Sequence, residues 1–401
     1  MSVLVAAWHA IRRNAETSQQ EKTKQSARKF GENLPANLRK LQDRLRLGYR
    51  FAEAYGATPQ KGAGKIGRRP IVVAPLEDRI VQRAILDVLQ SATEISDVQR
   101  VLQTPTSIGG IRGRGVNHAI ALFDERVKAG DRFVAGSDIS GFFTKIPRLI
   151  VIEFLRTASV ELEFVRLVEE ALTVELSNAD KLSEADRKLF PTGEDGVAQG
   201  CPLSAVAGNI VLEAFDRQMN GRGITCIRYI DDFIVIGKTP TAVQKAMDAA
   251  KVILAELKMD IYDPSKSPSK AFIGAVGEPH TFLGYKLLPG VYPPSDAACN
   301  NLMAHIQSLI ANGQAAISKG VAGRPWSSKD RCYAQTNVVI DHTVRGWRAS
   351  FRASNCPEIF DIIDKQIDRR LNDFCSFYLS KIAKRTAAQR RRALGVQLLS
   401  D

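Results

Sequence analysis

The chain has 401 residues, of which 44% are hydrophobic and 25% charged, and its formal net charge is +13 at pH 7. This composition excludes a disordered or fibrous polypeptide, and the lack of any run of about 18 apolar residues predicts that no segment enters a membrane. Lysines and arginines are spread along the whole chain, which favours a polyanionic partner such as nucleic acid.

The cysteines and histidines form no pattern typical of a zinc site. The six cysteines are scattered without Cys-x-x-Cys spacing, and the five histidines show no His-x-x-His arrangement. The apolar stretch at residues 1–10 is too short and unflanked to be a signal peptide. We therefore expect reduced thiols and a cytoplasmic protein.

The N-terminal segment is predicted to be helical and basic. Leu34, Leu38, Leu41 and Leu45 recur at helical spacing, so this stretch should present one apolar face. Residues 56–67 are rich in glycine and predict a loop. The apolar residues that follow predict a short strand over 68–75 and a helix over 76–90.

A loop rich in glycine and arginine follows at residues 107–115, ahead of a predicted helix over residues 117–128. Its glycines allow the backbone to approach a phosphate, and Arg112 and Arg114 can neutralise the charge of one. The loop is therefore a candidate nucleic-acid contact.

The middle of the chain predicts an antiparallel sheet. A strand over residues 132–135 leads to Asp138, where we expect it to end. Two apolar runs flank the sequence Tyr-Ile-Asp-Asp at residues 229–232, which predicts a β-hairpin with both acids at its tip. Helices are expected over residues 148–176 and 242–258, and residues 199–219 are expected to start as a tight Gly/Pro turn and become a helix. Closing strands are expected at 272–273 and 281–287, and helices again throughout 296–395.

Asp138, Asp231 and Asp232 are the candidate catalytic residues. Carboxylates at the ends of strands can converge on divalent cations, and paired Mg²⁺ ions, with Mn²⁺ as a substitute, are used to make phosphodiester bonds. An Asp-Asp pair between apolar runs is on its own most often a simple turn. The order of the surrounding motifs decides between these readings.

Asp138 is followed by Gln-Gly-Cys-Pro-Leu-Ser at residues 199–204, by the 229–232 motif and by Phe-Leu-Gly-Tyr at residues 282–285. This ordered set resembles the palm of reverse transcriptases, and the likeness covers roughly residues 35–375. It implies an α+β right-hand polymerase with an antiparallel palm sheet, mixed fingers and an all-helical thumb. The implied domains are an N-terminal helical segment with fingers (residues 1–130), a palm (131–290) and a helical thumb with a basic tail (291–401). The palm range includes finger elements around 150–197.

The resemblance implies a role for each motif. Asp138 and Asp231 would be the principal ligands of two metal ions, with Asp232 beside them and the carbonyl of Ile139 completing one shell. Phe143 would lie under the sugar of the incoming nucleotide and exclude a 2′-hydroxyl, unless Phe143 and its neighbour Phe142 are both core residues. The remaining residues implied to bind the substrate are Lys65, Arg69, Gln199, Gly200, Tyr229 and Lys266.

Two of these assignments have alternatives in the sequence. Lys258 could serve the leaving pyrophosphate in place of Lys266. Arg79 could reach the triphosphate like Arg69, or it could pair with one of the acids beside it, Glu77 or Asp78.

The C-terminal segment adds a second part to the resemblance. Residues 337–352 resemble the thumb helix of group II intron reverse transcriptases, chiefly through Gly-Trp at 346–347 and Phe-Arg at 351–352. Arg345, Arg348 and Arg352 are spaced three and four residues apart, which predicts one helix face able to follow a duplex backbone or a solvated basic face. Gly284 would belong to the strand that grips the primer.

The resemblance as a whole implies a bacterial RNA-directed DNA polymerase that uses dNTPs to copy an RNA template into DNA. The defence-associated, antiphage enzymes are of this kind, and they use a dedicated non-coding RNA as template. Two other functions fit the same features: an RNA-binding maturase or scaffold for an intron RNA, and a DNA polymerase that needs no template.

Overall fold

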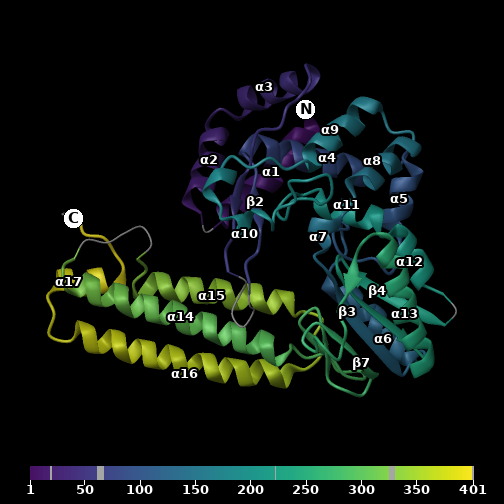
Figure 1. Cartoon of the computed structure of the whole chain (residues 1–401). Coiled ribbons are helices and arrows are strands. Elements are labelled where there is room, and N and C mark those ends of the chain that lie inside the picture. The colour runs from purple at the N-terminus through teal and green to yellow at the C-terminus, as the bar shows by residue number, and fades with distance from the viewer. Residues whose placement is uncertain (19, 61–66, 222, 325–329, 400–401) are drawn as a thin grey trace. The chain divides into compact units, whose positions relative to one another are not determined.

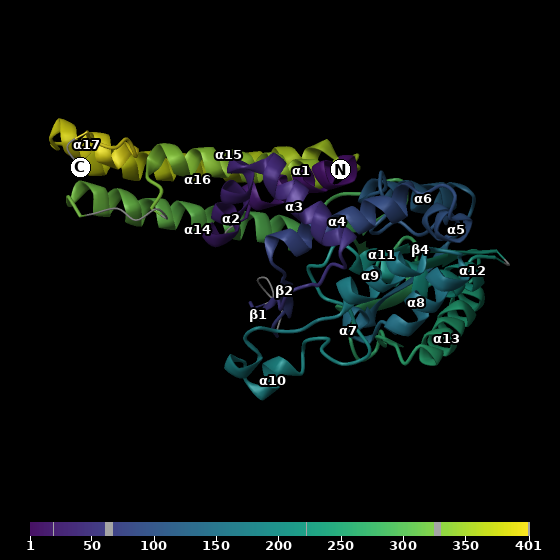
Figure 2. The ribbon, with the colours of Figure 1, turned by 90° about the horizontal axis from the view of Figure 1, so that it is seen from above.

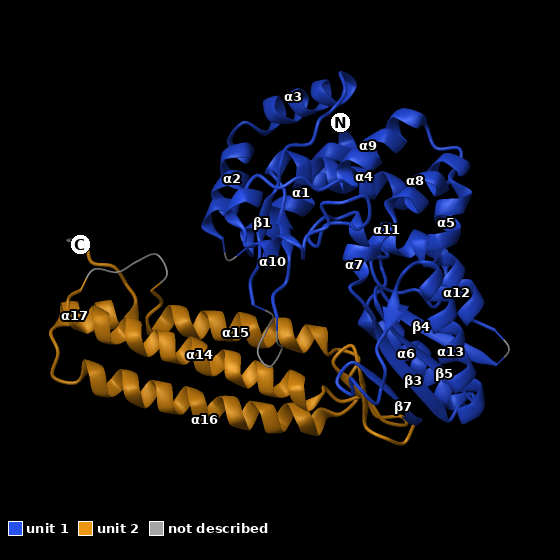
Figure 3. Ribbon diagram, in the orientation of Figure 1, with its two compact units in different colours: residues 1–275 blue, residues 276–401 orange. Residues whose placement is uncertain are grey.

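The computed structural model describes residues 1–18, 20–60, 67–221, 223–324 and 330–399 (Figure 1). The chain divides into two compact units, Met1–Ala275 and Val276–Asp401 (Figure 3). This division falls before residue 290, where the sequence predicts the boundary between palm and thumb. The functional division into fingers, palm and thumb stays a prediction.

Helices at the N-terminus pack around one buried aromatic pair. The ring of Trp8, which is 1% exposed, lies 5.0 Å from that of Phe30 between centroids. Leu38 and Leu41 are buried, as their helical spacing predicts. The helices are α1 (Ser2–Glu16), α2 (Glu21–Glu32), α3 (Leu34–Arg46) and α4 (Leu76–Ser91).

The central sheet is antiparallel, which confirms the predicted palm architecture. Its strands run in the order β4-β5-β3-β6, and β7 pairs with β3. The strands are β3 (Phe133–Ser140), β4 (Ile224–Tyr229), β5 (Asp232–Gly237), β6 (Asp260–Ile261) and β7 (Ala271–Ala275).

The middle of β5 is buried on both faces of the sheet. Phe233 and Val235 share the core with apolar residues of α13 (Pro240–Glu256), whereas Ile234 and Ile236 alternate onto the other face. Figure 2 shows α13 and α6 (Val116–Lys128) alongside β4. A fully buried strand at this position gives the hairpin a rigid base.

Several helices and a small sheet complete the first unit. The predicted helix over 148–176 is two helices, and Ser159 between them has a φ of +57°. The segment 199–219 starts as a turn, as predicted, and its helical part begins at Ser204 but is divided into two helices. The elements are β1 (Tyr55–Ala57), β2 (Ile71–Val73), α5 (Ser96–Gln103), α7 (Phe142–Lys145), α8 (Arg148–Thr157), α9 (Leu162–Leu172), η1 (Ala179–Lys181), α10 (Glu184–Arg187), α11 (Ser204–Val211) and α12 (Glu213–Met219).

The second unit is a helical bundle that follows a short hairpin. The hairpin joins β8 (His280–Phe282) to β9 (Tyr285–Leu287), and its turn residues Leu283 and Gly284 have φ values of +50° and +85°. Positive φ at both positions is the pattern of a type I′ turn, so the single strand predicted over 281–287 is wrong.

The bundle confirms the helices predicted beyond residue 296. Buried side chains such as Ile306, Ile340, Ile363 and Phe374 form its core. The helices are α14 (Asp296–Val321), α15 (Tyr333–Ser350), α16 (Pro357–Ile382) and α17 (Ala387–Leu394). Among the described residues, none of the helices combines the length and apolar character needed to cross a membrane.

Candidate active site at the palm hairpin

The predicted β-hairpin of residues 224–236 is present. Tyr229 pairs with Asp232, so Ile230 and Asp231 alone form the turn, and Asp232 is already the first residue of β5. Ile230 has a φ of +63°, the pattern of a type II′ turn, whose first position usually holds glycine. A β-branched residue in this conformation costs roughly 1–3 kcal/mol. The surrounding structure must therefore hold the turn in place.

Asp138 lies opposite this turn on the neighbouring strand. It pairs directly with Asp232, so the two side chains share one face of the sheet. The amide of Ile139 donates a hydrogen bond of 2.8 Å to the carbonyl of Asp231. The strand does not end at Asp138, as the sequence predicted, but continues to Ser140, because Ile139 and Ser140 pair with β6.

The charges of this site act on one another. Burial raises the pKa of Asp231, and the negative charge of Asp138 raises it further, whereas Lys270 and Arg69 lower it. Asp138 is thus close enough for its charge to act on Asp231. Such a pair of carboxylates attracts a cation.

A lysine that the sequence did not single out lies beside these acids. The Nζ of Lys270 is 2.6 Å from Oδ2 of Asp138 and 4.8 Å from the centre of the Tyr262 ring. Burial lowers the pKa of Lys270, but the hydrogen bond to Asp138 and the negative charges of Asp138 and Asp231 together outweigh this effect, so the pKa is raised. The predicted pyrophosphate residue, Lys266, lies four positions earlier, and its side chain is exposed.

The register of the sheet explains the position of Lys270. This residue immediately precedes β7, whose first residue, Ala271, pairs with Ser137. Continuing the ladder by one residue brings Lys270 to Asp138, and the Asp138 amide donates to its carbonyl at 3.3 Å. The pairing of β7 with β3 is a long-range contact, so the sequence alone offered no signal for it.

The carboxylates fit a divalent cation that is completed by its substrate. Within the described ranges, no group of three or more His, Cys, Asp or Glu side chains forms a metal cage. Mg²⁺ commonly binds one or two carboxylates together with substrate phosphates, and it prefers oxygen ligands. Asp138 and Asp231 provide that donor set.

The predicted Gln-Gly motif lies against the strand β2. The amide of Val72 donates to the carbonyl of Gln199 at 2.9 Å. Gly200 has a φ of +117°, and a Cβ there would lie 2.7 Å from the carbonyl oxygen of Val72, so only glycine fits. The motif is therefore fixed to the segment that carries Arg69.

The basic residues near β2 have different environments. Arg69 is exposed and its charge reaches Asp231, whereas the neighbouring Arg68 pairs with Asp186 at 2.6 Å. Lys65 lies outside the described residues. The acids proposed as partners of Arg79 have other partners: Glu77 pairs with Arg44, and Asp78 accepts from Tyr49.

The two phenylalanines after Asp138 have different environments. Phe142 is 2% exposed, and its ring occupies the space beside Gly208, where a Cβ would lie 2.7 Å from it. Phe143 is only partly buried, and its carbonyl accepts from Val197 at 2.7 Å. Phe142 is therefore the core residue, which leaves the ring of Phe143 as the candidate beneath a sugar.

Comparison with known proteins identifies the family. The profile of the family described as "Reverse transcriptase (RNA-dependent DNA polymerase)" matches residues 59–287, more than half of the chain. The chain belongs to the reverse transcriptase family. Its enzyme class is accordingly RNA-directed DNA polymerase, a nucleotidyltransferase.

Individual relatives of this reverse transcriptase are distant. Protein YkfC of Escherichia coli (strain K12) is 25% identical over 296 residues, which are 64% of this chain and 72% of that protein. A solved apo telomerase from Candida tropicalis, truncated from its C-terminal domain, has 12% identity and a TM-score of 0.43, with 61% of this chain and 55% of that one covered. A partial Cas6-RT-Cas1–Cas2 complex has 21% identity and a TM-score of 0.35, with 63% and 40% covered. The chain thus spans about half of the telomerase chain and two fifths of the chain in the Cas6-RT-Cas1–Cas2 complex.

The Gly/Arg loop ahead of α6 uses its two arginines differently. The guanidinium of Arg114 donates to the backbone carbonyl of Ser107 at the start of its loop and to that of Thr104, just after α5. Arg112 is exposed to solvent. Arg114 therefore fixes the loop, and Arg112 is the better candidate for a phosphate contact.

The thumb arginines do not share one helix face as predicted. Helix α15 ends at Ser350, so Arg352 lies beyond it in the following turn. Arg345 pairs with Asp341 at 2.9 Å, and Arg348 lies 4.2 Å above the ring of Phe360. Gly284 lies in the β8–β9 turn, where an added Cβ would meet the ring of Phe351 at 3.4 Å.

Proposed function

We propose that this protein adds dNTPs to the 3′-hydroxyl of a primer under the direction of an RNA template, with Asp138 and Asp231 as the principal ligands of two divalent cations. The observation that carries the proposal is the meeting of these two carboxylates at one end of the sheet. The hydrogen bond from Ile139 to the carbonyl of Asp231 joins their strands there, and the charge of Asp138 acts on Asp231.

The residues around the acids have complementary proposed roles. Asp232 lies beside the principal pair, and the carbonyl of Ile139 would complete one shell. Mg²⁺, with Mn²⁺ as a substitute, would supply stabilisation of the charge on the attacking 3′-oxygen and on the leaving pyrophosphate. Lys270, rather than Lys266, is proposed to serve the leaving pyrophosphate, because its Nζ lies 2.6 Å from Oδ2 of Asp138.

A second group of residues is proposed to bind and select the nucleotide. Arg69, with Lys65, would bind the triphosphate, because its charge already reaches Asp231. Gln199, Gly200 and Tyr229 would line the nucleotide and the template base. The partly exposed ring of Phe143 would exclude a 2′-hydroxyl and so favour dNTPs.

The nucleic acid is proposed to contact exposed arginines of both units and a glycine in the β8–β9 turn. The candidates are Arg112 in the first unit and Gly284, Arg345, Arg348 and Arg352 in the second, with Arg114 holding its loop. The thumb sequence supports a relation to group II intron reverse transcriptases, and we propose a dedicated non-coding RNA template in bacterial antiphage defence, within the cytoplasm. Sequencing the nucleic acid that copurifies with the protein tests this assignment.

A templated incorporation assay distinguishes the proposed polymerase from the two alternatives. Four RNA templates that differ only in the first unpaired base are each annealed to the same DNA primer and offered all four dNTPs singly. The proposal predicts incorporation of the complementary dNTP on each template. The same product on all four templates would indicate template-independent synthesis, and tight RNA binding without any incorporation would indicate a maturase or scaffold.

A further inference from the structure

We infer that the buried guanidinium of Arg228 positions the strained turn that carries Asp231, and thereby sets how tightly the acids hold their metal ions. This inference rests on the proposed metal-dependent function. Arg228 would be a positioning residue, because it acts on Asp231 through the backbone and does not reach the reacting atoms.

Arg228 forms a buried ion pair with a helix beside the sheet. It lies in β4, next to Tyr229, and is 0% exposed, while Asp216 in α12 is 3% exposed. The Nε donates to Oδ1 of Asp216 at 2.7 Å and Nη2 donates to Oδ2 at 2.5 Å. A two-pronged pair of this kind fixes the plane of the guanidinium as well as its position.

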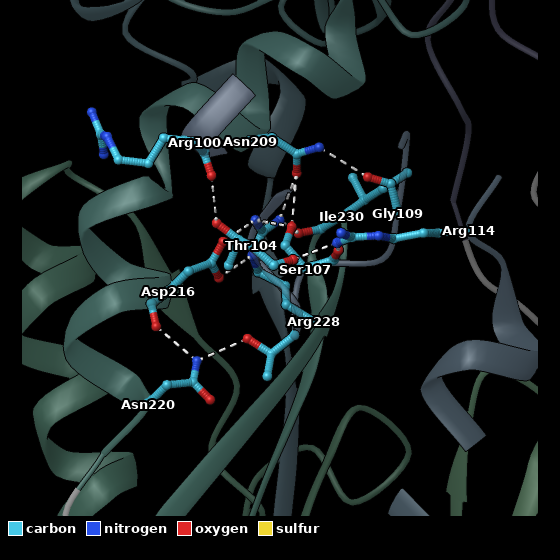
Figure 4. A network of polar contacts seen from close by, with 11 residues as sticks. Arg100, Thr104, Ser107, Gly109, Arg114, Asn209, Asp216, Asn220, Arg228 and Ile230 are labelled. Carbon is cyan, nitrogen blue, oxygen red and sulfur yellow. Dashed lines mark hydrogen bonds and ion pairs between the residues drawn. The ribbon is translucent and has the colours of Figure 1, made fainter. Parts of the chain in front are cut away.

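The remaining donors of Arg228 reach the turn and its supports. Nη1 donates to the carbonyl of Ile230 at 2.8 Å and to Oδ1 of Asn209 at 3.1 Å, and Nη2 donates to Oγ of Ser107 at 2.8 Å (Figure 4). All five N–H groups of the guanidinium are thus used. The Ile230 carbonyl belongs to the peptide group that leads into Asp231, so this hydrogen bond orients the backbone of the predicted metal ligand.

The same network presses a second segment against the turn. A Cβ on Gly109 would lie 2.6 Å from the amide nitrogen of Ile230, so the backbone at Gly109 is in close contact with the turn. Asn209, the acceptor of Nη1, donates through Nδ2 to the carbonyl of Gly109 at 3.0 Å. Ile108 donates to the carbonyl of Arg228 at 2.8 Å. The carbonyl of Ile230 is therefore held by Arg228, and its amide nitrogen is packed against Gly109. Asn209 and Arg228 both form hydrogen bonds to the loop that contains Gly109.

The conformation of Ile230 is the reason to assign a positioning role. A β-branched residue with a φ of +63° returns to an ordinary conformation unless its neighbours prevent it. Releasing the Ile230 carbonyl would allow that change, and Asp231, the next residue, would move with it. An ion pair needed only for stability would not have to bind the carbonyl of the one strained residue in the hairpin.

The test compares two variants of the network with one control variant in a different ion pair. Arg228→Lys keeps the charge but cannot make the five hydrogen bonds, and Asn209→Ala leaves the ion pair intact while loosening the support of the loop. The control, Arg126→Lys, makes the same change in a second ion pair with a buried acid, in which Nη2 of Arg126 lies 2.9 Å from Oδ2 of the fully buried Asp131. Each full-length variant is assayed for Mn²⁺ binding by electron paramagnetic resonance, for thermal unfolding, and for kcat as a function of Mg²⁺ concentration.

The expected result is a loss of metal affinity that is independent of stability. Arg228→Lys should weaken Mn²⁺ binding about 10- to 100-fold, as removal of an outer-shell partner does, and should lower kcat, with Asn209→Ala changing both in the same direction by less. Arg126→Lys should lower the unfolding temperature with wild-type Mn²⁺ affinity. Folded Arg228→Lys with wild-type Mn²⁺ affinity and kcat would overturn the inference; if that variant does not fold, unchanged Mn²⁺ affinity in Asn209→Ala overturns it.

Two reference proteins separate this inference from the proposed function. If the wild type binds no Mn²⁺ and makes no DNA, the proposed function itself fails. If the wild type is active, Asp231→Asn is inactive and Arg228→Lys behaves as the wild type, only the positioning role of Arg228 fails.

Discussion

The side-chain nitrogen of Lys270 lies 2.6 Å from a carboxylate oxygen of Asp138. The pair exists because β7 lies beside β3, which brings a residue 132 positions along the chain to the candidate metal ligand. A protein cation at this position competes with any divalent cation for the same carboxylate. The pair is partly exposed, so the competition should be modest.

Removing this lysine should therefore strengthen metal binding to the free protein. Lys270→Met is expected to tighten Mn²⁺ binding roughly fivefold, which corresponds to about 1 kcal/mol, the upper range for an exposed ion pair. Titration followed by electron paramagnetic resonance in the absence of nucleotide measures the effect. Lys266→Met is the matched control and should bind as the wild type; an effect at Lys266 with none at Lys270 would reverse the assignment made from the structure.

The two neighbouring phenylalanines should separate sugar selection from stability. Phe143→Ala should admit ribonucleotides and lower the ratio of kcat/KM for dNTP over NTP, because the ring no longer excludes a 2′-hydroxyl. Phe142→Ala should leave that ratio unchanged and lose about 3–5 kcal/mol of unfolding free energy, since its ring fills the core. Single-nucleotide incorporation and urea unfolding measure the two effects. An unchanged ratio in Phe143→Ala would show that another residue selects the sugar.

The thumb arginines should contribute to the salt dependence of nucleic-acid binding. Replacing Arg345, Arg348 and Arg352 together with Gln should lower the slope of log affinity against log salt by up to about 2–3, since up to three fewer phosphates are neutralised. Fluorescence anisotropy with an RNA–DNA duplex measures the slope. Arg166→Gln, an exposed change in α9, is the control. An identical slope in the triple variant would mean that these residues only face solvent.

A buried tyrosine–aspartate pair near the N-terminal helices should make stability depend on pH. Burial raises the pKa of Asp78, while hydrogen bonds from the Tyr49 hydroxyl at 2.6 Å and the Ala52 amide at 3.0 Å lower it. Because the folded-state pKa is raised, the stability that this carboxyl contributes is present at low pH and is lost as pH rises through the folded pKa.

Tyr49→Phe removes one of the hydrogen bonds that favour the ionised carboxylate, so the pKa of Asp78 should rise further. The variant should lose roughly 1–3 kcal/mol of unfolding free energy at a pH above the folded-state pKa of Asp78, where the carboxylate is ionised, and less at a pH below it. Urea unfolding at the two pH values measures the difference. An equal loss at both would mean that the hydroxyl acts only through packing.

Local patterns in the sequence were enough to predict the hairpin, the antiparallel sheet and the helical second unit. The apolar runs around residues 229–232 and the leucine spacing before residue 46 each depend on neighbours close in the chain. Long-range pairing was not accessible in this way. Lys270 reaches Asp138 only through the register of β7, and the strand of Asp138 continues to Ser140 only because β6 pairs with it.

Turn geometry was the other source of error. The sequence 282–285 is apolar enough to resemble a strand, but positive φ at Leu283 and Gly284 makes it a tight hairpin. The arginine spacing after residue 344 fits a helix, yet α15 ends at Ser350 before the third arginine. The buried partners of Arg228 lie in α11, in α12 and in the loop before α6, so no spacing near 229–232 indicated them.

The central claim is that Asp231 belongs to the catalytic metal site. The most direct test measures incorporation of one dNTP by Asp231→Asn protein on a primed RNA template with Mg²⁺. Loss of one negative charge from the carboxylate pair should lower kcat/KM at least about 10³-fold, which corresponds to about 4 kcal/mol. Asp248→Asn, an exposed change in α13, should retain wild-type kcat/KM, and both proteins should unfold at the wild-type temperature. Folded Asp231→Asn protein that extends the primer at the wild-type rate would contradict the assignment of this carboxylate to the catalytic metal site.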